Sequence, residues 1–304
     1  MSHRRIKNQS ASVRQRLLNL AREKSEDFQT WLDRFAAERL LYRLSQSKHR
    51  GSFALKGAAL FAVWSEEVYR PTRDIDLLGW GDNSQSRMRD VFRELCTAAV
   101  DDDGLVFDAD SVAVREIAAH QEYGGLRVIL RADLAGARAH VQVDIGFGDA
   151  ITPGPVEVEY TSILGFPPAV MQAYPKESVV AEKVQAIVSL GLVNSRLKDF
   201  WDVYNLAQVT EFDGGRLCEA LRATFSRRKT ALPGSTPVAL TDRFYDDLVK
   251  QRQWEGFKRE SRVDSQAGLD EVCVLLEQFL MPPLKTSAEN KTFDKIWQPG
   301  GPWC

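Results

Sequence analysis

The sequence is 304 residues long, which allows one large domain or two modest ones, and its hydrophobic fraction of 44% is enough for a buried core. Its net charge of −2 excludes a general basic field, so a nucleic-acid partner would have to bind through local patches. The four cysteines lack zinc-site or disulfide spacing, and there is no secretory signal or apolar stretch of membrane length. We therefore expect a soluble cytoplasmic protein with no membrane partner.

The first half of the chain alternates helix and strand patterns, as expected for an α/β (α+β) domain with a small mixed sheet. Residues 26–46 carry apolar side chains at helical spacing, and Ser25 or Asp27 is the expected N-cap. Further expected elements are a helix over residues 84–99 and strands over residues 53–56, 74–78, 112–117, 126–134, 139–147 and 156–163.

A strand, a glycine and a helix follow one another over residues 53–64. We expect the strand to end at Lys56 and the helix to begin at Gly57. Backbone N–H groups at a helix N-terminus attract anions, and Lys56 adds a positive charge, so this turn predicts a phosphate-binding site. Gly57 taken alone is also compatible with an ordinary turn residue.

Asp74 and Asp76 are the most informative pair of residues in the chain. They lie two apart in an apolar, extended context, so both side chains are expected on one side of a strand, with Ile75 turned into the core. Paired carboxylates suit Mg²⁺ or Mn²⁺, which a phosphoryl or nucleotidyl transferase shares with substrate phosphates. Two aspartates at this spacing also occur on solvated strand edges, so the pair alone is a weak signal.

Asp144 follows near the end of the strand pattern over residues 141–145. If that strand lies beside the strand of Asp74 and Asp76, three carboxylates converge. The alternative is a carboxylate at a strand end that neighbouring N–H groups satisfy.

From residue 176 onward the patterns are helical. The segment over residues 165–168 predicts a boundary, which divides the chain into domains 1–165 and 166–304. Lys183 lies in the first helix of the second half; Lys198, Asp199 and Asp202 share one face of the next, where ordinary ion pairing is the simpler interpretation. The expected helices cover residues 176–190, 195–208, 215–225, 241–251 and 266–280, before a non-helical tail over residues 299–304.

These segments together resemble the AbiEii/AbiGii toxin family of nucleotidyltransferases. The resemblance covers about residues 56–206, half of the chain. Its motifs, in the family's order, are Lys56-Gly57, Arg70-x-Thr72-x-Asp74-Ile75-Asp76-Leu77, and the stretches over residues 143–149, 177–183 and 194–202. One departure is Ala58-Ala59, where the family often has a second glycine or a Ser/Thr, so a hydroxyl contact to phosphate is not expected.

The resemblance implies a nucleotidyltransferase fold in residues 1–165, with N-terminal helices, and a helical domain in residues 166–304 that completes the nucleotide cleft. Asp74, Asp76 and Asp144 would be the catalytic, metal-binding carboxylates. Lys183 would be catalytic and contact the phosphates of an NTP, while Asp199 or Asp202 would orient Lys183, the base or the ribose; the sequence does not rank these two. The remaining nucleotide-binding residues would be Lys56, Gly57, Arg70, Thr72, Arg196 and Lys198.

The resemblance also implies a toxin of a bacterial toxin–antitoxin or abortive-infection pair, with a cognate antitoxin as partner. We expect it to transfer NMP from an NTP to the 3′ end of tRNA and so to block translation. Alternatives are a nucleotidyltransferase for a small molecule or a protein, and an inhibitory binding protein without catalysis. Basic residues that either follow an RNA backbone or are simply solvated are Arg4, Arg5, Arg14, Arg16, Arg227, Arg228 and Lys229.

Overall fold

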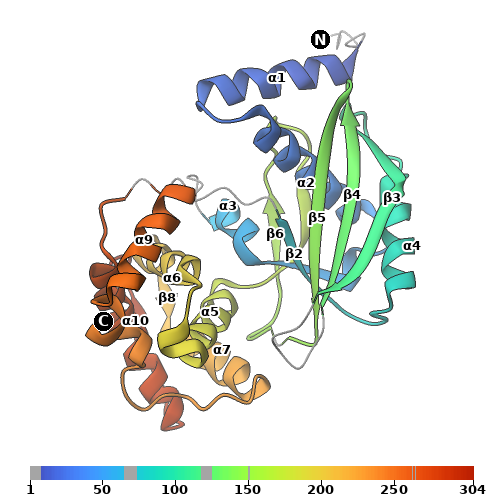
Figure 1. The fold of residues 1–304 in the computed structure, drawn as a ribbon. Helices are drawn as coiled ribbons and strands as arrows, with labels where there is room; N and C mark the ends of the chain where they lie inside the picture. The colour runs from blue at the N-terminus through green and yellow to red at the C-terminus, as the bar shows by residue number, and fades with distance from the viewer. Residues whose placement is uncertain (1–7, 65–73, 118–124, 150, 262, 264) are drawn as a thin grey trace. The chain divides into compact units, whose positions relative to one another are not determined.

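The computed structural model describes residues 8–64, 74–117, 125–149, 151–261, 263 and 265–304 (Figure 1). The described chain divides into two compact units. The first unit contains the described parts of Met1–Val68 and Thr72–Gly148, together with Val156–Ala173. The second contains the described parts of Asp149–Pro155 and Tyr174–Cys304.

The first unit is an α/β unit built on a seven-stranded mixed sheet with the strand order β3-β4-β5-β2-β1-β7-β6. β2 runs parallel to β5 and β1 runs parallel to β7, whereas the other neighbours are antiparallel. The strands are β1 (Phe53–Lys56), β2 (Asp74–Gly79), β3 (Val106–Ile117), β4 (Gly125–Leu134), β5 (Ala137–Phe147), β6 (Val156–Tyr160) and β7 (Ala169–Ala173). The helices are α1 (Gln9–Glu23), α2 (Phe28–Gln46), α3 (Phe61–Trp64) and α4 (Gln85–Cys96).

The helices α2 and α4 pack against one face of this sheet. Leu44 of α2 and Phe92 of α4 meet Ile75 of β2 and Val143 of β5 in the core, and all four are at most 2% exposed. Because side chains alternate along a strand, the neighbours of Ile75 and Val143 must point to the other face. The apolar period of β2 and β5 therefore decides where their aspartates lie.

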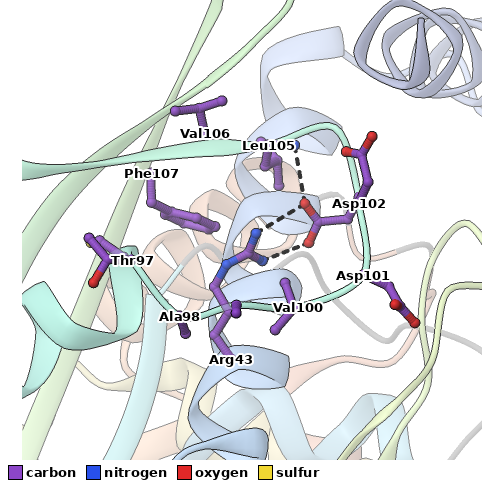
Figure 2. Close-up of a pocket in the computed structure, with 12 residues that line it drawn as sticks. Arg43, Thr97, Ala98, Val100, Asp101, Asp102, Leu105, Val106 and Phe107 are labelled. Atoms are coloured by element: carbon purple, nitrogen blue, oxygen red, sulfur yellow. Dashed lines mark hydrogen bonds and ion pairs between the residues drawn. The ribbon is translucent and has the colours of Figure 1, made fainter. Parts of the chain in front are cut away.

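A buried ion-pair cluster holds the loop between α4 and β3 against α2. Arg43 Nη1 and Nη2 donate to the two carboxylate oxygens of Asp103 at 2.6 and 3.1 Å, and Arg39 Nε donates to Asp103 at 3.1 Å. Burial alone would raise the pKa of Asp103, but the arginines outweigh it and leave that pKa below its usual value. Figure 2 shows Arg43 reaching this loop, where Asp101 and Asp102 border a pocket of about 340 Å³.

The second unit is mainly helical. Its helices are α5 (Lys176–Leu190), α6 (Leu197–Val209), α7 (Gly214–Arg227), α8 (Asp242–Tyr245), α9 (Leu248–Glu260) and α10 (Leu269–Ala288), and its two short strands are β8 (Phe212–Asp213) and β9 (Ile296–Trp297). Trp297 is 1% exposed, packs against Phe279 with the ring centroids 4.9 Å apart, and donates its indole N–H to the carbonyl of Ala207 at 2.7 Å. The segment near the C-terminus is thus part of the core of this unit.

The α/β class and most of the predicted elements are confirmed, with several corrections. The helix expected over residues 241–251 is two helices, because Asp247 caps α9 by accepting N–H bonds from Val249 and Lys250. The last long helix continues to Ala288 through Pro282 and Pro283. Strand β7 was not predicted, because two prolines precede its short apolar run; it pairs with β1 and β6. Within the described residues, no helix is long and apolar enough to cross a membrane.

Candidate active site

The predicted carboxylates lie on adjacent strands of the first unit. β2 and β5 are parallel neighbours, and their register pairs Asp76 with Asp144 and Asp74 with Gln142. The predicted adjacency of the two strands is confirmed. Register partners point to the same side of a sheet, so Asp74, Asp76 and Asp144 share the face opposite α2 and α4. Asp74 is exposed, and Asp76 and Asp144 are half-buried.

Gly57 and Lys56 border this carboxylate group from the neighbouring strand. Lys56 at the end of β1 is the register partner of Asp76. The helix expected from Gly57 is instead a 3-10 turn over Gly57–Leu60 that leads into the short α3. Gly57 has φ +70°, and a Cβ there would lie 2.1 Å from Asp76 Oδ2. The backbone of Gly57 thus closely approaches the Asp76 carboxylate, which only a residue without a side chain permits.

Gly57→Ala is expected to reduce the nucleotidyl transfer that the resemblance implies by about 100-fold, because the new methyl group must displace the Asp76 carboxylate and small displacements cost about that factor. The positive φ should also cost about 1 kcal/mol of folding free energy. Gly136→Ala is the matched control, because Gly136 has φ +82° and open space where a Cβ would lie. Both variants should lose similar stability in thermal denaturation, and only Gly57→Ala should lose activity. Equal activity in the two variants would contradict the role of this contact.

Arg127 on β4 is a functional candidate that the sequence interpretation missed. It is the register partner of Asp144, and its Nε and Nη2 donate to the two Asp144 oxygens, each at 2.7 Å. These hydrogen bonds raise the pKa of the Arg127 guanidinium above its usual value. The negative charges of Asp74 and Asp76 raise it further, so Arg127 lies in the field of all three carboxylates. The alternating pattern of β4 predicts on which face of the sheet Arg127 lies, but the sequence does not predict that Asp144 is its partner.

The donor chemistry of this group fits a hard divalent cation, because all three candidate ligands are carboxylates on one face of the sheet. The three carboxylates are not placed as the ligands of a bound metal ion would be. Among the described residues, no three acidic, histidine or cysteine side chains are gathered closely enough to hold a metal ion. Asp144 is directed at Arg127 instead, with both of its oxygens engaged.

A second group of predicted residues comes together in the second unit. Lys183 Nζ of α5 donates to Asp199 Oδ1 at 2.9 Å and to Asp202 Oδ2 at 2.7 Å, both on α6. Asp199 also pairs with Arg196 at 2.7 Å. Lys183 is 12% exposed and the two aspartates at most 1%. The structure therefore brings both aspartates to Lys183, where the sequence could not choose between them.

The charge balance of this group keeps Lys183 protonated. Burial alone would lower the pKa of Lys183, but Asp202 and Asp199 outweigh it and raise that pKa well above its usual value. Burial would raise the pKa of Asp199, but Lys183 and Arg196 hold it below its usual value. Lys198 is exposed on α6 and belongs to this group only through its charge.

The other predicted residues are separate from these two groups or are not described. Arg70 and Thr72 of the nucleotide-binding set, and Arg4 and Arg5 of the basic set, lie outside the described residues. The pocket bordered by Asp101 and Asp102 is lined, in its described part, by residues other than those predicted for the site.

The basic set shows a mixed pattern. Arg14 is exposed, as a residue that binds an RNA backbone would be. Arg16 instead donates to the carbonyl of Leu164, and Arg228 bonds Gln185 at 3.0 Å and pairs with Glu182 at 3.3 Å. Arg16 and Arg228 therefore contribute to contacts within their own units.

The chain is similar to one known protein family and to solved structures. The family model described as “Nucleotidyl transferase AbiEii toxin, Type IV TA system” matches residues 39–294, which include every predicted site residue. No curated protein matches the sequence. The crystal structure of JHP933 from Helicobacter pylori is 15% identical with a TM-score of 0.46, over 83% of this chain and 87% of that one. A structure described as a candidate nucleotidyltransferase from H. pylori is 15% identical with a TM-score of 0.45, over 83% and 89%.

Proposed function

Because this chain belongs to the AbiEii family of nucleotidyltransferase toxins of type IV toxin–antitoxin systems, we propose that it transfers NMP from an NTP to the 3′ end of tRNA and thereby blocks translation. The observation that supports this proposal most directly is the register of Asp76 with Asp144, with the backbone of Gly57 against the Asp76 carboxylate. A cognate antitoxin and a cytoplasmic location belong to the same proposal.

The proposed reaction is a substitution at the α-phosphorus of the NTP. The oxygen of the acceptor hydroxyl forms a bond to that phosphorus, the bond to the β-phosphate oxygen breaks, and pyrophosphate leaves. Mg²⁺ or Mn²⁺ bound by Asp74, Asp76 and Asp144 would screen the phosphate charge and orient the hydroxyl. Gly57 leaves room for the Asp76 carboxylate, and Asp144, the register partner of Asp76, would accept the hydroxyl proton.

The cationic side chains would bind the triphosphate. Lys56 lies in register with Asp76, and the backbone of Gly57 begins the adjoining turn. In the second unit, Lys183 stays protonated between Asp199 and Asp202 and would contact the β- and γ-phosphates as a positive charge. We propose Arg70, Thr72, Arg196 and Lys198 as further nucleotide contacts. Most of the rate enhancement would come from positioning and electrostatic stabilisation, as in phosphoryl transfer generally.

The proposal is tested by incubating the protein with total tRNA, Mg²⁺ and each labelled NTP in turn, beside Asp76→Ala. Label should enter RNA with the wild type only, and the favoured NTP would identify the donor. If the wild type labels no RNA with any NTP and still arrests growth, tRNA is not the acceptor. Replacing tRNA with a cell extract, and finding label in a protein or a small molecule, would then identify the acceptor class.

A further inference from the structure

Four neighbouring strands carry charged side chains at one level of the sheet. Successive register pairs join Lys56 to Asp76, Asp76 to Asp144, and Asp144 to Arg127. The two acidic residues at the centre of this row therefore have a basic residue on either side. Arg127, the basic residue beside Asp144, makes two charge-assisted hydrogen bonds to that carboxylate, which is a strong arrangement for an arginine.

This ion pair lies outside the apolar core of the first unit. Arg127 is 32% and Asp144 21% exposed, so the pair lies on the outer face of the sheet and not in the apolar core. The hydrophobic side chains next to them in sequence, Val128 and Val143, are at most 1% exposed and hold β4 and β5 in place from the other face. The two strands are thus packed through their apolar face, and the ion pair lies on the same face as the candidate site.

The ion pair also opposes cation binding by Asp144. Each Asp144 oxygen already accepts an N–H at 2.7 Å, and a divalent cation would need at least one of these oxygens as a ligand. The guanidinium and the cation would repel each other at such close range. Arg127 therefore opposes binding of the cation to Asp144, through its charge and because it already uses one lone pair of each oxygen.

We propose that Arg127 is a positioning residue that holds Asp144 and competes with the catalytic cation for it. Arg127 keeps adjacent carboxylates from repelling one another while no cation is bound. It also lowers the affinity of Asp144 for divalent cations, so that Asp144 becomes a ligand when the cation, alone or with its nucleotide, outcompetes the guanidinium. This inference rests on the proposed function, since it assumes that Asp76 and Asp144 bind a cation.

The test is a titration of the nucleotide-free protein with Mn²⁺, in which free Mn²⁺ is measured by its electron paramagnetic resonance signal. Arg127→Met should bind Mn²⁺ about tenfold more tightly than the wild type, in line with a charge-assisted pair of about 1.4 kcal/mol. Arg127→Lys should fall between the two, because lysine keeps the charge but cannot donate to both oxygens in one plane. Arg115→Met is the charge control: Arg115 lies opposite Arg127 on β3, one strand farther from Asp144. It should change the affinity less than twofold.

Asp76→Asn separates failure of this inference from failure of the proposed function. If Asp76→Asn weakens Mn²⁺ binding and Arg127→Met leaves it unchanged, Arg127 does not compete with the cation for Asp144. The proposal that these carboxylates bind a cation would still be supported. Equal tightening by Arg115→Met and Arg127→Met would also overturn the competition, because net charge alone would then account for it. If the wild type and Asp76→Asn bind Mn²⁺ equally, the cation site itself is wrong. Thermal denaturation of Arg127→Met checks that the variant is folded.

Discussion

Asp76→Asn is expected to lower the rate of nucleotidyl transfer by about 1,000-fold, equivalent to about 4 kcal/mol of transition-state stabilisation. Asparagine has nearly the size of aspartate, so the close approach of Gly57 to this side chain is retained. The substitution removes the negative charge that a divalent cation requires, next to Asp144 at the centre of the charged row. Folding stability should hardly change, because Asp76 is half-buried and lies outside the apolar core.

The measurement is single-turnover incorporation of labelled nucleotide, together with growth arrest in the absence of the antitoxin. Asp90→Asn is the matched control, because Asp90 is exposed on α4, which packs against the opposite face of the sheet. It should retain full activity. If Asp76→Asn keeps more than about a tenth of the wild-type rate while folding normally, the carboxylate is not a metal ligand in the transition state.

The face on which the candidate carboxylates lie could be predicted from the sequence because it follows from a local rule. In β2, the apolar Ile75 and Leu77 alternate with Asp74 and Asp76, and burial of the apolar pair decides the direction of the aspartates. The partner of Asp144 could not be predicted in the same way. Its pairing with Arg127 depends on the register between β4 and β5, and that register is fixed by the β4–β5 hairpin and the whole apolar face.

The same distinction applies in the second unit. The spacing of Asp199 and Asp202 places them on one face of α6, and that much is a property of the helix alone. Their shared partner Lys183 is on α5, so the contact depends on how two helices pack. The break between α8 and α9 has a local cause and could have been predicted from the sequence. Asp246 and Asp247 interrupt the apolar period, and Asp247 is the N-cap of α9.

Lys183→Met is expected to destabilise the protein by about 3–5 kcal/mol at about pH 7.5, as well as to abolish activity. Methionine fills much of the same volume, so the loss is not a cavity effect. It arises because Asp199 and Asp202 are at most 1% exposed and would lose the ammonium group that neutralises them. Lys198→Met removes the same charge from an exposed position of α6 and should change the stability by less than about 0.5 kcal/mol.

The pH dependence distinguishes loss of this neutralising charge from poor packing. In the wild type, the pKa of Asp199 is held below its usual value, so the stability that this contributes is present above the unfolded pKa and is lost as the pH falls through the folded one. In Lys183→Met, mainly Arg196 is left to counter the effect of burial on the pKa of Asp199, so that pKa should rise. As the pH falls, Asp199 is then protonated, and the cost of burying its negative charge disappears. The stability difference between the two proteins, measured by urea denaturation, should therefore shrink between about pH 7.5 and about pH 5, and adding Asp202→Asn to the variant should recover part of it. A difference that does not vary with pH would mean that Lys183 acts through shape rather than charge.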